Sequence, residues 1–102
     1  MSQVLLLYAR GCPNWRALDG LLRQMAVAWG FTLDRREVVT LEEAQRLGFA
    51  GSPTVLINGR DPFPSDGNAS LSCRLYATET GLRGVPATEG LLAALHRAAL
   101  DG

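Results

Sequence analysis

The chain has 102 residues, a mass of 11.0 kDa and 47% hydrophobic residues, enough for one domain with a modest core and too little for two. Ten basic residues balance ten acidic ones, and neither sign forms a long run, which argues against nucleic acid or an anionic membrane surface as a partner. We therefore expect a single domain over residues 1–102 whose partners are small molecules or proteins. No pattern in the sequence indicates an oligomeric state.

The N-terminal segment, MSQVLLLYARGCPNW, has four consecutive aliphatic residues and no basic residues before them, unlike a secretory signal peptide. No later apolar run is long enough to span a bilayer. We therefore expect a cytoplasmic location. In such a reducing compartment, Cys12 and Cys73 are expected to be free thiols at rest.

The first half of the chain predicts two strands and two helices. The aliphatic run QVLLLY, residues 3–8, is typical of a central strand covered on both faces. Apolar residues at intervals of three and four predict a helix that ends at Gly30: Trp15, Leu18, Leu21, Leu22, Met25 and Trp29. We expect Trp29, at the end of this helix, to lie in the core. Residues 31–39 alternate like a strand exposed on one face. Thr40 and Glu43 have the spacing of a capping box that opens a short helix.

The second half predicts a hairpin and a final helix. Residues 54–57, within SPTVLING, read as a strand that ends in an Asn-Gly turn. A loop rich in turn formers follows at residues 60–70, after which residues 71–78 regain strand character and are expected to pair with the first strand of the hairpin. Thr88 has the character of an N-cap for the last helix. This order predicts an α/β fold, a four-stranded mixed sheet flanked by three helices.

Cys12 lies in a Gly-Cys-Pro run, where the first predicted strand gives way to the first predicted helix. Exposed backbone N–H groups and the positive end of the helix dipole favour a thiolate there. Pro13 fits the first helical turn, since its missing N–H would have had no partner. With Arg10 and Arg16 on either side, the pattern predicts a pKa for the Cys12 thiol below the free value of about 8.5. The alternative is a buried, inert cysteine.

Two separated stretches, LLLYARGCPNWRAL and GSPTVLING, resemble the thioredoxin superfamily, and its glutaredoxin-like branch most of all. The first looks like the family's strand, Cys-Pro-aromatic motif and helix, and the second like its cis-proline segment. The resemblance implies a thioredoxin-like fold with Cys12 as the nucleophile and Ser52 and Pro53 facing it. In that family, the backbone before the proline pairs antiparallel with a bound peptide or glutathione. Pro13, Asn14 and Trp15 would then border the substrate.

The chain departs from this family at Trp15, where a second cysteine is expected. This tryptophan would either form an apolar wall beside the Cys12 sulfur or pack in the core. Three routes stay open for Cys12: resolution by a low-molecular-weight thiol such as glutathione, resolution by Cys73, or binding of a soft metal ion. We expect Cys73 at the sheet edge, on the strand paired with residues 54–57, where the distance can exceed the ~7 Å Cα separation that a disulfide tolerates. Packing alone is the alternative role for Cys73.

Three functions follow, in order of preference. The first is a thiol–disulfide oxidoreductase without a resident cofactor, acting on a small-molecule thiol or a protein disulfide. The second is a soft-metal or organomercurial-handling protein using Cys12 and Cys73, because the run CRLY is faintly similar to the organomercurial (alkylmercury) lyases, although Asp19 lies almost two helical turns from Cys12. The third is a non-catalytic interaction module whose apolar surface includes Trp15 and Phe63.

Overall fold

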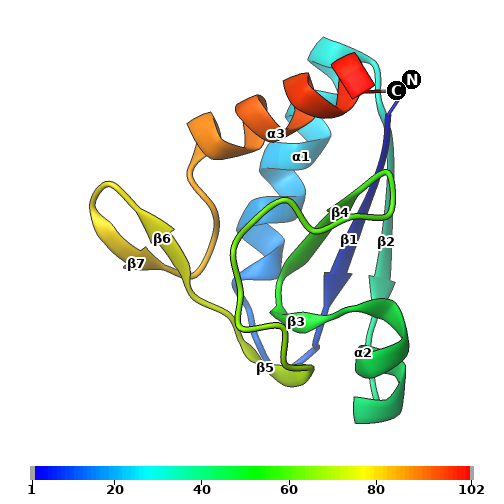
Figure 1. Ribbon diagram of the computed structural model, residues 1–102, viewed down its shortest axis with the longest axis vertical. Helices are drawn as coiled ribbons and strands as arrows, with labels where there is room; N and C mark the ends of the chain where they lie inside the picture. Colours follow the sequence, from blue (N-terminus) through cyan, green and yellow to red (C-terminus); the bar gives the residue numbers. More distant parts are fainter. Residues whose placement is uncertain (1, 102) are drawn as a thin grey trace.

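The computed structural model describes residues 2–101 (Figure 1). Its elements, in chain order, are β1 (Gln3–Tyr8), α1 (Trp15–Trp29), β2 (Thr32–Glu37), α2 (Leu41–Leu47), β3 (Ala50–Ser52), β4 (Thr54–Ile57), β5 (Ser70–Cys73), β6 (Tyr76–Thr78), β7 (Gly81–Arg83) and α3 (Thr88–Asp101). Within this part of the chain the fold is mixed α/β with three helices. The predicted strands at residues 3–8 and 54–57 are confirmed, as are the three predicted helices.

β1 is the central strand of a three-stranded mixed sheet in the order β2-β1-β4. It runs parallel to β2 and antiparallel to β4. The aliphatic run places Leu6 and Leu7 on opposite faces of the sheet, and both side chains are fully buried. The prediction of a central strand covered on both faces is therefore confirmed.

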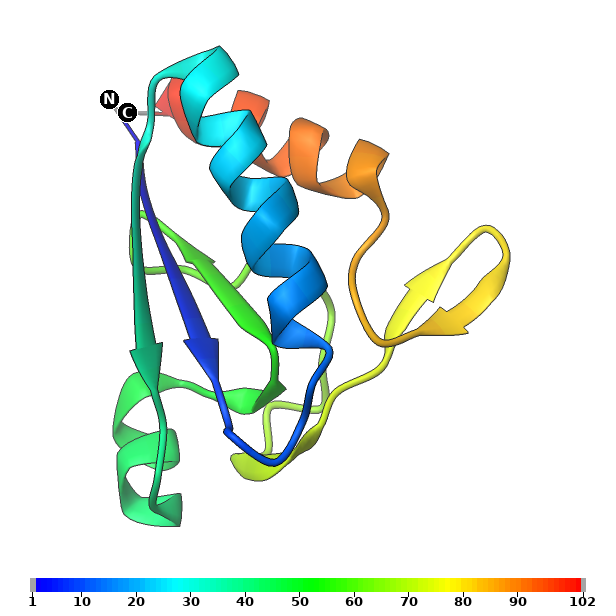
Figure 2. The same cartoon turned by 180° about the vertical axis from the view of Figure 1, so that it is seen from behind.

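Helices α1 and α3 lie together on one face of this sheet (Figure 2). Their apolar side chains meet those of β1 and β4 in the larger core cluster: Leu18, Leu22, Met25, Leu91, Leu95, Val4, Leu6, Val55 and Ile57. The expected core position of Trp29 is wrong, since this side chain is 59% exposed. It follows the apolar stripe but lies one helical turn beyond Met25, the last buried residue of α1, so the last turn of the helix extends past the core.

The opposite face is covered by α2 and by the chain that leads into β3. A second, smaller cluster forms there: Leu7, Ala9, Val38, Ala44, Phe49 and Leu56. No helix in the described part of the chain is long and apolar enough to cross a membrane. The two clusters together hold the strand ends in fixed positions, including the end of β1 that leads to Cys12.

The start of α2 shows the predicted capping box with one difference. The Thr40 hydroxyl accepts a hydrogen bond from the backbone N–H of Glu43 at 3.1 Å. The Glu43 carboxylate reaches back and accepts from the N–H of Val39, one residue before the cap, also at 3.1 Å. Two of the free N–H groups at the helix start are thus satisfied.

The expected fourth strand of the sheet, residues 71–78, does not pair with β4, so the four-stranded sheet is a wrong prediction. The segment divides at Arg74 into β5, which pairs parallel with β3, and β6, which forms an antiparallel hairpin with β7. The β4 ladder stops after a bridge to Arg60 because Pro62 and Pro64, which have no N–H to donate, follow almost at once. The β6–β7 hairpin projects from the body of the protein (Figures 1 and 2).

Candidate functional site

Cys12 and Cys73 are joined by a disulfide bond across 61 residues of sequence, with their Cα atoms 5.5 Å apart. Two predictions are corrected here, because the cysteines are not free thiols and Cys73 is not on a strand beside β4. Since β5 pairs with β3, Cys73 lies opposite Ser52, and the loop between β1 and α1 runs beside β5 (Figures 1 and 2). The strand pairing that the sequence did not reveal is what brings the two cysteines together.

Cys12 is fixed within the loop that joins β1 to α1. Its backbone N–H donates to the carbonyl of Ala9 at 3.1 Å, which makes a tight turn three residues before the helix begins at Trp15. The residue is only 1% exposed, and its Sγ lies 3.5 Å from the carbonyl oxygen of Ser52. The implied placement of Ser52 beside Cys12 is therefore present in the structure.

Three residues around Cys12 that the resemblance implied for substrate binding lie in different surroundings. Pro13 is exposed, and its carbonyl accepts from a backbone N–H in the first turn of α1. Asn14 is half-buried against Gly84, where any added Cβ would overlap the asparagine side chain. Trp15 is half-buried, stacks on Tyr8 with ring centroids 4.1 Å apart, and packs against the larger core cluster. Asn14 and Trp15 are thus used to pack the protein itself.

Ser52 and Pro53 form the floor of the site, joined by a cis peptide bond. The Ser52 hydroxyl accepts a hydrogen bond from the N–H of Ala9 at 2.9 Å, which ties β3 to the loop that carries Cys12. The Ser52 carbonyl accepts from the N–H of Arg74 at 2.8 Å. The backbone beside this proline is therefore paired with the protein's own β5 segment.

Arg74 is a site residue that sequence reasoning missed. It is 5% exposed, and its guanidinium forms an ion pair of 2.6 Å with Asp61 and a hydrogen bond of 3.2 Å to the carbonyl of Phe63. A buried arginine requires such partners, because an unpaired charge in the interior is strongly unfavourable. No periodicity singles out Arg74 in the sequence, because its partners lie in a loop without regular structure. The arginine next to Cys73 thus anchors the loop over residues 60–69.

Tyr76 completes the anchoring of the β5 segment. Its hydroxyl donates a hydrogen bond to the carbonyl of Pro53, and its ring lies under the Arg74 guanidinium, 4.5 Å from ring centroid to carbon. Burial raises the pKa of Tyr76 above its usual range, so the phenol stays a neutral donor. Phe63 packs edge-on against the same ring, with centroids 5.4 Å apart.

The two arginines expected to surround Cys12 with positive potential differ in their contacts. Arg10 forms an ion pair with Glu37 at 2.8 Å, which offsets its charge. Arg16 is exposed and lies 5.5 Å from the centroid of the Trp15 ring. The lowered pKa of the Cys12 thiol concerns the reduced protein and stays a prediction.

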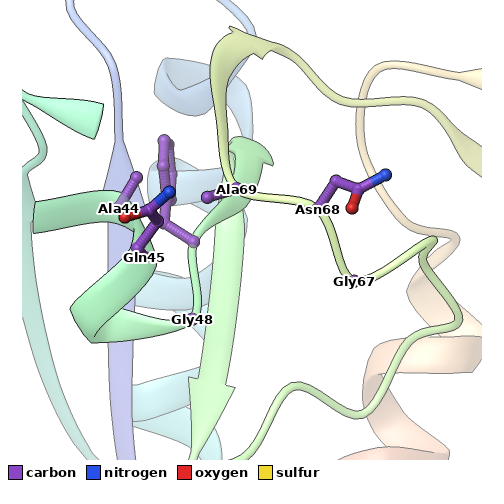
Figure 3. A pocket seen from close by; sticks show the side chains of 7 residues that line it. Ala44, Gln45, Gly48, Gly67, Asn68 and Ala69 are labelled. Carbon is purple, nitrogen blue, oxygen red and sulfur yellow. The ribbon is translucent and has the colours of Figure 1, made fainter. Parts of the chain in front are cut away.

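A hollow of about 380 Å³ lies between the end of α2 and the chain that leads into β5 (Figure 3). It is lined by Ala44, Gln45, Gly48, Phe49, Gly67, Asn68 and Ala69. None of these side chains is ionisable or nucleophilic, so the hollow offers no group for covalent chemistry.

No protein-family model and no curated protein matches this chain. No cluster of three or more His, Cys, Asp or Glu side chains that could hold a metal ion occurs between residues 2 and 101. What the site can do chemically is open and close one sulfur–sulfur bond, or offer two thiolates once that bond is reduced.

Proposed function

We propose that this protein is a thiol–disulfide oxidoreductase whose redox couple is Cys12 and Cys73. The observation that carries the proposal is the disulfide between the cysteine of the Gly-Cys-Pro junction and a cysteine that strand pairing brings beside it. A dithiol mechanism needs a second thiol to attack the mixed disulfide formed by the first. With Trp15 in the usual position of that thiol, Cys73 supplies it from a different part of the chain.

We interpret the domain as a thioredoxin-like variant of the glutaredoxin-like type. The interpretation is supported by the β1–α1 junction at Cys12, by the parallel β2 and antiparallel β4 beside β1, and by the cis-proline segment 3.5 Å from the Cys12 sulfur. The variant has three strands in its main sheet, and the segment that would extend it forms β5, β6 and β7 instead.

The reaction cycles between the disulfide and two thiols without a resident cofactor. Two equivalents of an external thiol, such as glutathione, reduce the bond and leave as their own disulfide, and an external disulfide reverses the reaction. The protein contributes the geometry, since both sulfurs are held on chain segments that hydrogen-bond to Ser52 or to its neighbours.

A redox titration tests this proposal. The protein is equilibrated in mixtures of reduced and oxidised glutathione, and the free thiols are counted by mass after alkylation. We expect one two-electron transition, which either Cys12→Ser or Cys73→Ser abolishes and which Ser72→Ala, a matched change in β5, preserves. A Cys12–Cys73 bond that never forms under oxidising mixtures contradicts the proposal. The rate of iodoacetamide alkylation of reduced Cys12 against pH then measures the predicted lowered pKa.

A second function, soft-metal binding, is favoured by the closeness of the two sulfurs. The described residues hold no cluster of three or more His, Cys, Asp or Glu side chains, so such a site would offer two sulfur ligands. Two thiolates suit ions such as Hg(II) that accept soft ligands at low coordination number. The buried carboxylate of Asp19 is already in ion pairs with Arg23 and Arg35, at 3.0 and 3.1 Å, so it is not free for organomercurial cleavage. Binding of one Hg(II) by the reduced protein that survives Cys73→Ser unchanged contradicts this second proposal.

The interaction-module hypothesis has less support. Trp15 and Phe63 would supply its apolar surface, but both are half-buried, Trp15 stacked on Tyr8 and Phe63 packed edge-on against Tyr76. Partner binding that is unaffected by Cys12→Ser would revive it.

A further inference from the structure

The two halves of the disulfide differ in how solvent reaches them. Cys12 is 1% exposed, whereas Cys73 is exposed at the end of β5, together with Leu71 and Ser72 before it. A thiolate attacks a disulfide by approaching one sulfur directly, so the rate depends on access to that sulfur. Cys73 is the more exposed residue of the pair, so we take its Sγ as the sulfur that a thiol from solvent reaches first.

The backbone position that a peptide substrate would use is already filled. In β3, Ser52 lies opposite Cys73, and its carbonyl accepts from the N–H of Arg74 at 2.8 Å. Contact is so close that a Cβ added to Gly51 would come within 2.9 Å of the Arg74 Cβ. The Arg74 guanidinium ties β5 to its surroundings through a hydrogen bond to the Thr54 hydroxyl at 3.3 Å and the ion pair with Asp61 of the loop. An extended peptide can therefore pair with β3 only after β5 has left.

We propose that the oxidised protein exchanges with low-molecular-weight thiols rather than with extended protein segments, and that exchange begins at Sγ of Cys73. This inference rests on the proposed function. It reverses the roles expected from the sequence, in which Cys12 meets the substrate and Cys73 resolves the intermediate. β5 occupies the backbone position at which the resemblance implies pairing of a peptide or of glutathione, so neither can pair there. A small thiol can still react at Cys73 without that pairing, whereas an extended segment loses its main backbone contact.

A thiolate, RS⁻, attacks Sγ of Cys73, the Cys12–Cys73 bond breaks, and Cys12 leaves as a thiolate with the electron pair of that bond. The start of α1, three residues later, favours negative charge at this leaving sulfur. A second RS⁻ attacks the external sulfur of the mixed disulfide and releases RSSR and the Cys73 thiolate. Both protein thiolates take up the protons that the two external thiols gave to water.

Trapping the mixed disulfide tests the direction of attack. Oxidised wild-type protein is mixed with excess reduced glutathione and quenched with acid, and free thiols are labelled with N-ethylmaleimide. Trypsin separates the two cysteines, since the peptide over residues 11–16 contains Cys12 and that over residues 61–74 contains Cys73. We expect glutathione on Cys73 and maleimide on Cys12, in about tenfold excess over the opposite pattern. A predominance of glutathione on Cys12 overturns the proposal.

Two variants give an answer that does not depend on the lifetime of the intermediate. Reduced Cys12→Ser and Cys73→Ser each keep one thiol, whose rate per thiolate with oxidised glutathione is compared with that of the same variant unfolded in guanidinium chloride. We expect folding to slow Cys12 about tenfold and to change Cys73 by less than about twofold. Equal slowing of the two thiols, or greater slowing of Cys73, overturns the assignment. If no thiol reduces the wild-type disulfide, the proposed function is contradicted instead. The comparison of the two single-cysteine variants does not depend on that result.

The substrate class has its own test. Reduction of the oxidised protein by glutathione is compared with reduction by an unstructured peptide that has one internal cysteine, at equal thiolate concentration. We expect glutathione to react about tenfold faster, and Asp61→Asn, which loosens β5, to narrow that difference. A peptide that reacts as fast as glutathione with the wild-type protein overturns the preference.

Discussion

Residues 3–57 and residues 58–87 are held together in different ways. The first region contains the three-stranded sheet, and apolar side chains cover both of its faces. The second region contains β5 and the projecting β6–β7 hairpin. The side chains of β5 and β7 are mostly exposed. Phe63, Ala69 and Val85 of this region pack against the core clusters. Its polar and covalent links are few: the Cys12–Cys73 disulfide and the Tyr76 hydrogen bond tie it to the first region, and the Arg74–Asp61 ion pair ties β5 to the loop within it.

The contrast gives a structural reason for the proposed difference in reactivity between Cys12 and Cys73. Cys12 belongs to the region with the apolar core, and we expect it to stay in place when the disulfide opens, because hydrogen bonds to Ala9 and Ser52 hold its loop. Cys73 belongs to the region that depends on a few links, of which the disulfide is one. We therefore expect reduction to loosen residues 58–87 while the sheet keeps its order.

Reduction of the disulfide is the largest expected effect on stability. The bond closes a loop of 61 residues, and the loss of that constraint on the unfolded chain lowers the free energy of unfolding by about 4 kcal/mol. Urea denaturation with and without dithiothreitol measures this change, and hydrogen exchange locates it. The double variant Cys12→Ser with Cys73→Ser is the control and should give the same stability in both conditions. Equal loss of protection in β1 and in β5 would contradict the division into two regions.

Asp61→Asn tests the second link. The substitution leaves the Arg74 guanidinium, with its side chain 4% exposed, without its carboxylate, and we expect the free energy of unfolding to fall by about 3 kcal/mol. Asp66→Asn, an exposed change in the same loop, should stay within about 0.5 kcal/mol of wild type. Urea midpoints at constant slope give both values. If the two variants behave alike, the ion pair does not hold the loop.

The same division decides how much could be predicted from the sequence. In the first region, apolar periodicity predicts β1, β2, β4 and α1 correctly, because burial of one face gives a repeating local pattern. Gly30 correctly marks the end of α1, and Thr40 the start of α2. In the second region, β5 pairs with β3, and Arg74 reaches Asp61 across a loop, and no repeating pattern in the sequence records such single contacts. The position of Cys12 was accordingly predictable, while its covalent partner required the fold.

Tyr76→Phe tests the third link with a smaller change. Without the hydroxyl, the buried carbonyl of Pro53 loses its donor, and we expect a loss of about 1–2 kcal/mol in the free energy of unfolding. Tyr8→Phe is the matched control, since the ring that stacks on Trp15 is retained. Thermal denaturation under oxidising conditions measures both. A loss of equal size in the two variants would show that the ring rather than the hydrogen bond to Pro53 matters.

The smallest expected effect on stability concerns Glu43 in the first region, and it is measurable at acidic pH. The hydrogen bond from the Val39 N–H, followed by that from Arg36, lowers the pKa of the Glu43 carboxyl below its ordinary 4.5. Because the pKa is lower in the folded protein than in the unfolded chain, the carboxylate stabilises the fold fully above pH 4.5, and this contribution is lost as the pH falls through the folded value. Glu43→Gln should flatten that part of the stability profile, and Glu42→Gln, its neighbour in the same helical turn, should serve as the reference. Urea denaturation between acidic and neutral pH makes the comparison, and a profile unchanged by Glu43→Gln would mean that α2 is held by apolar packing alone.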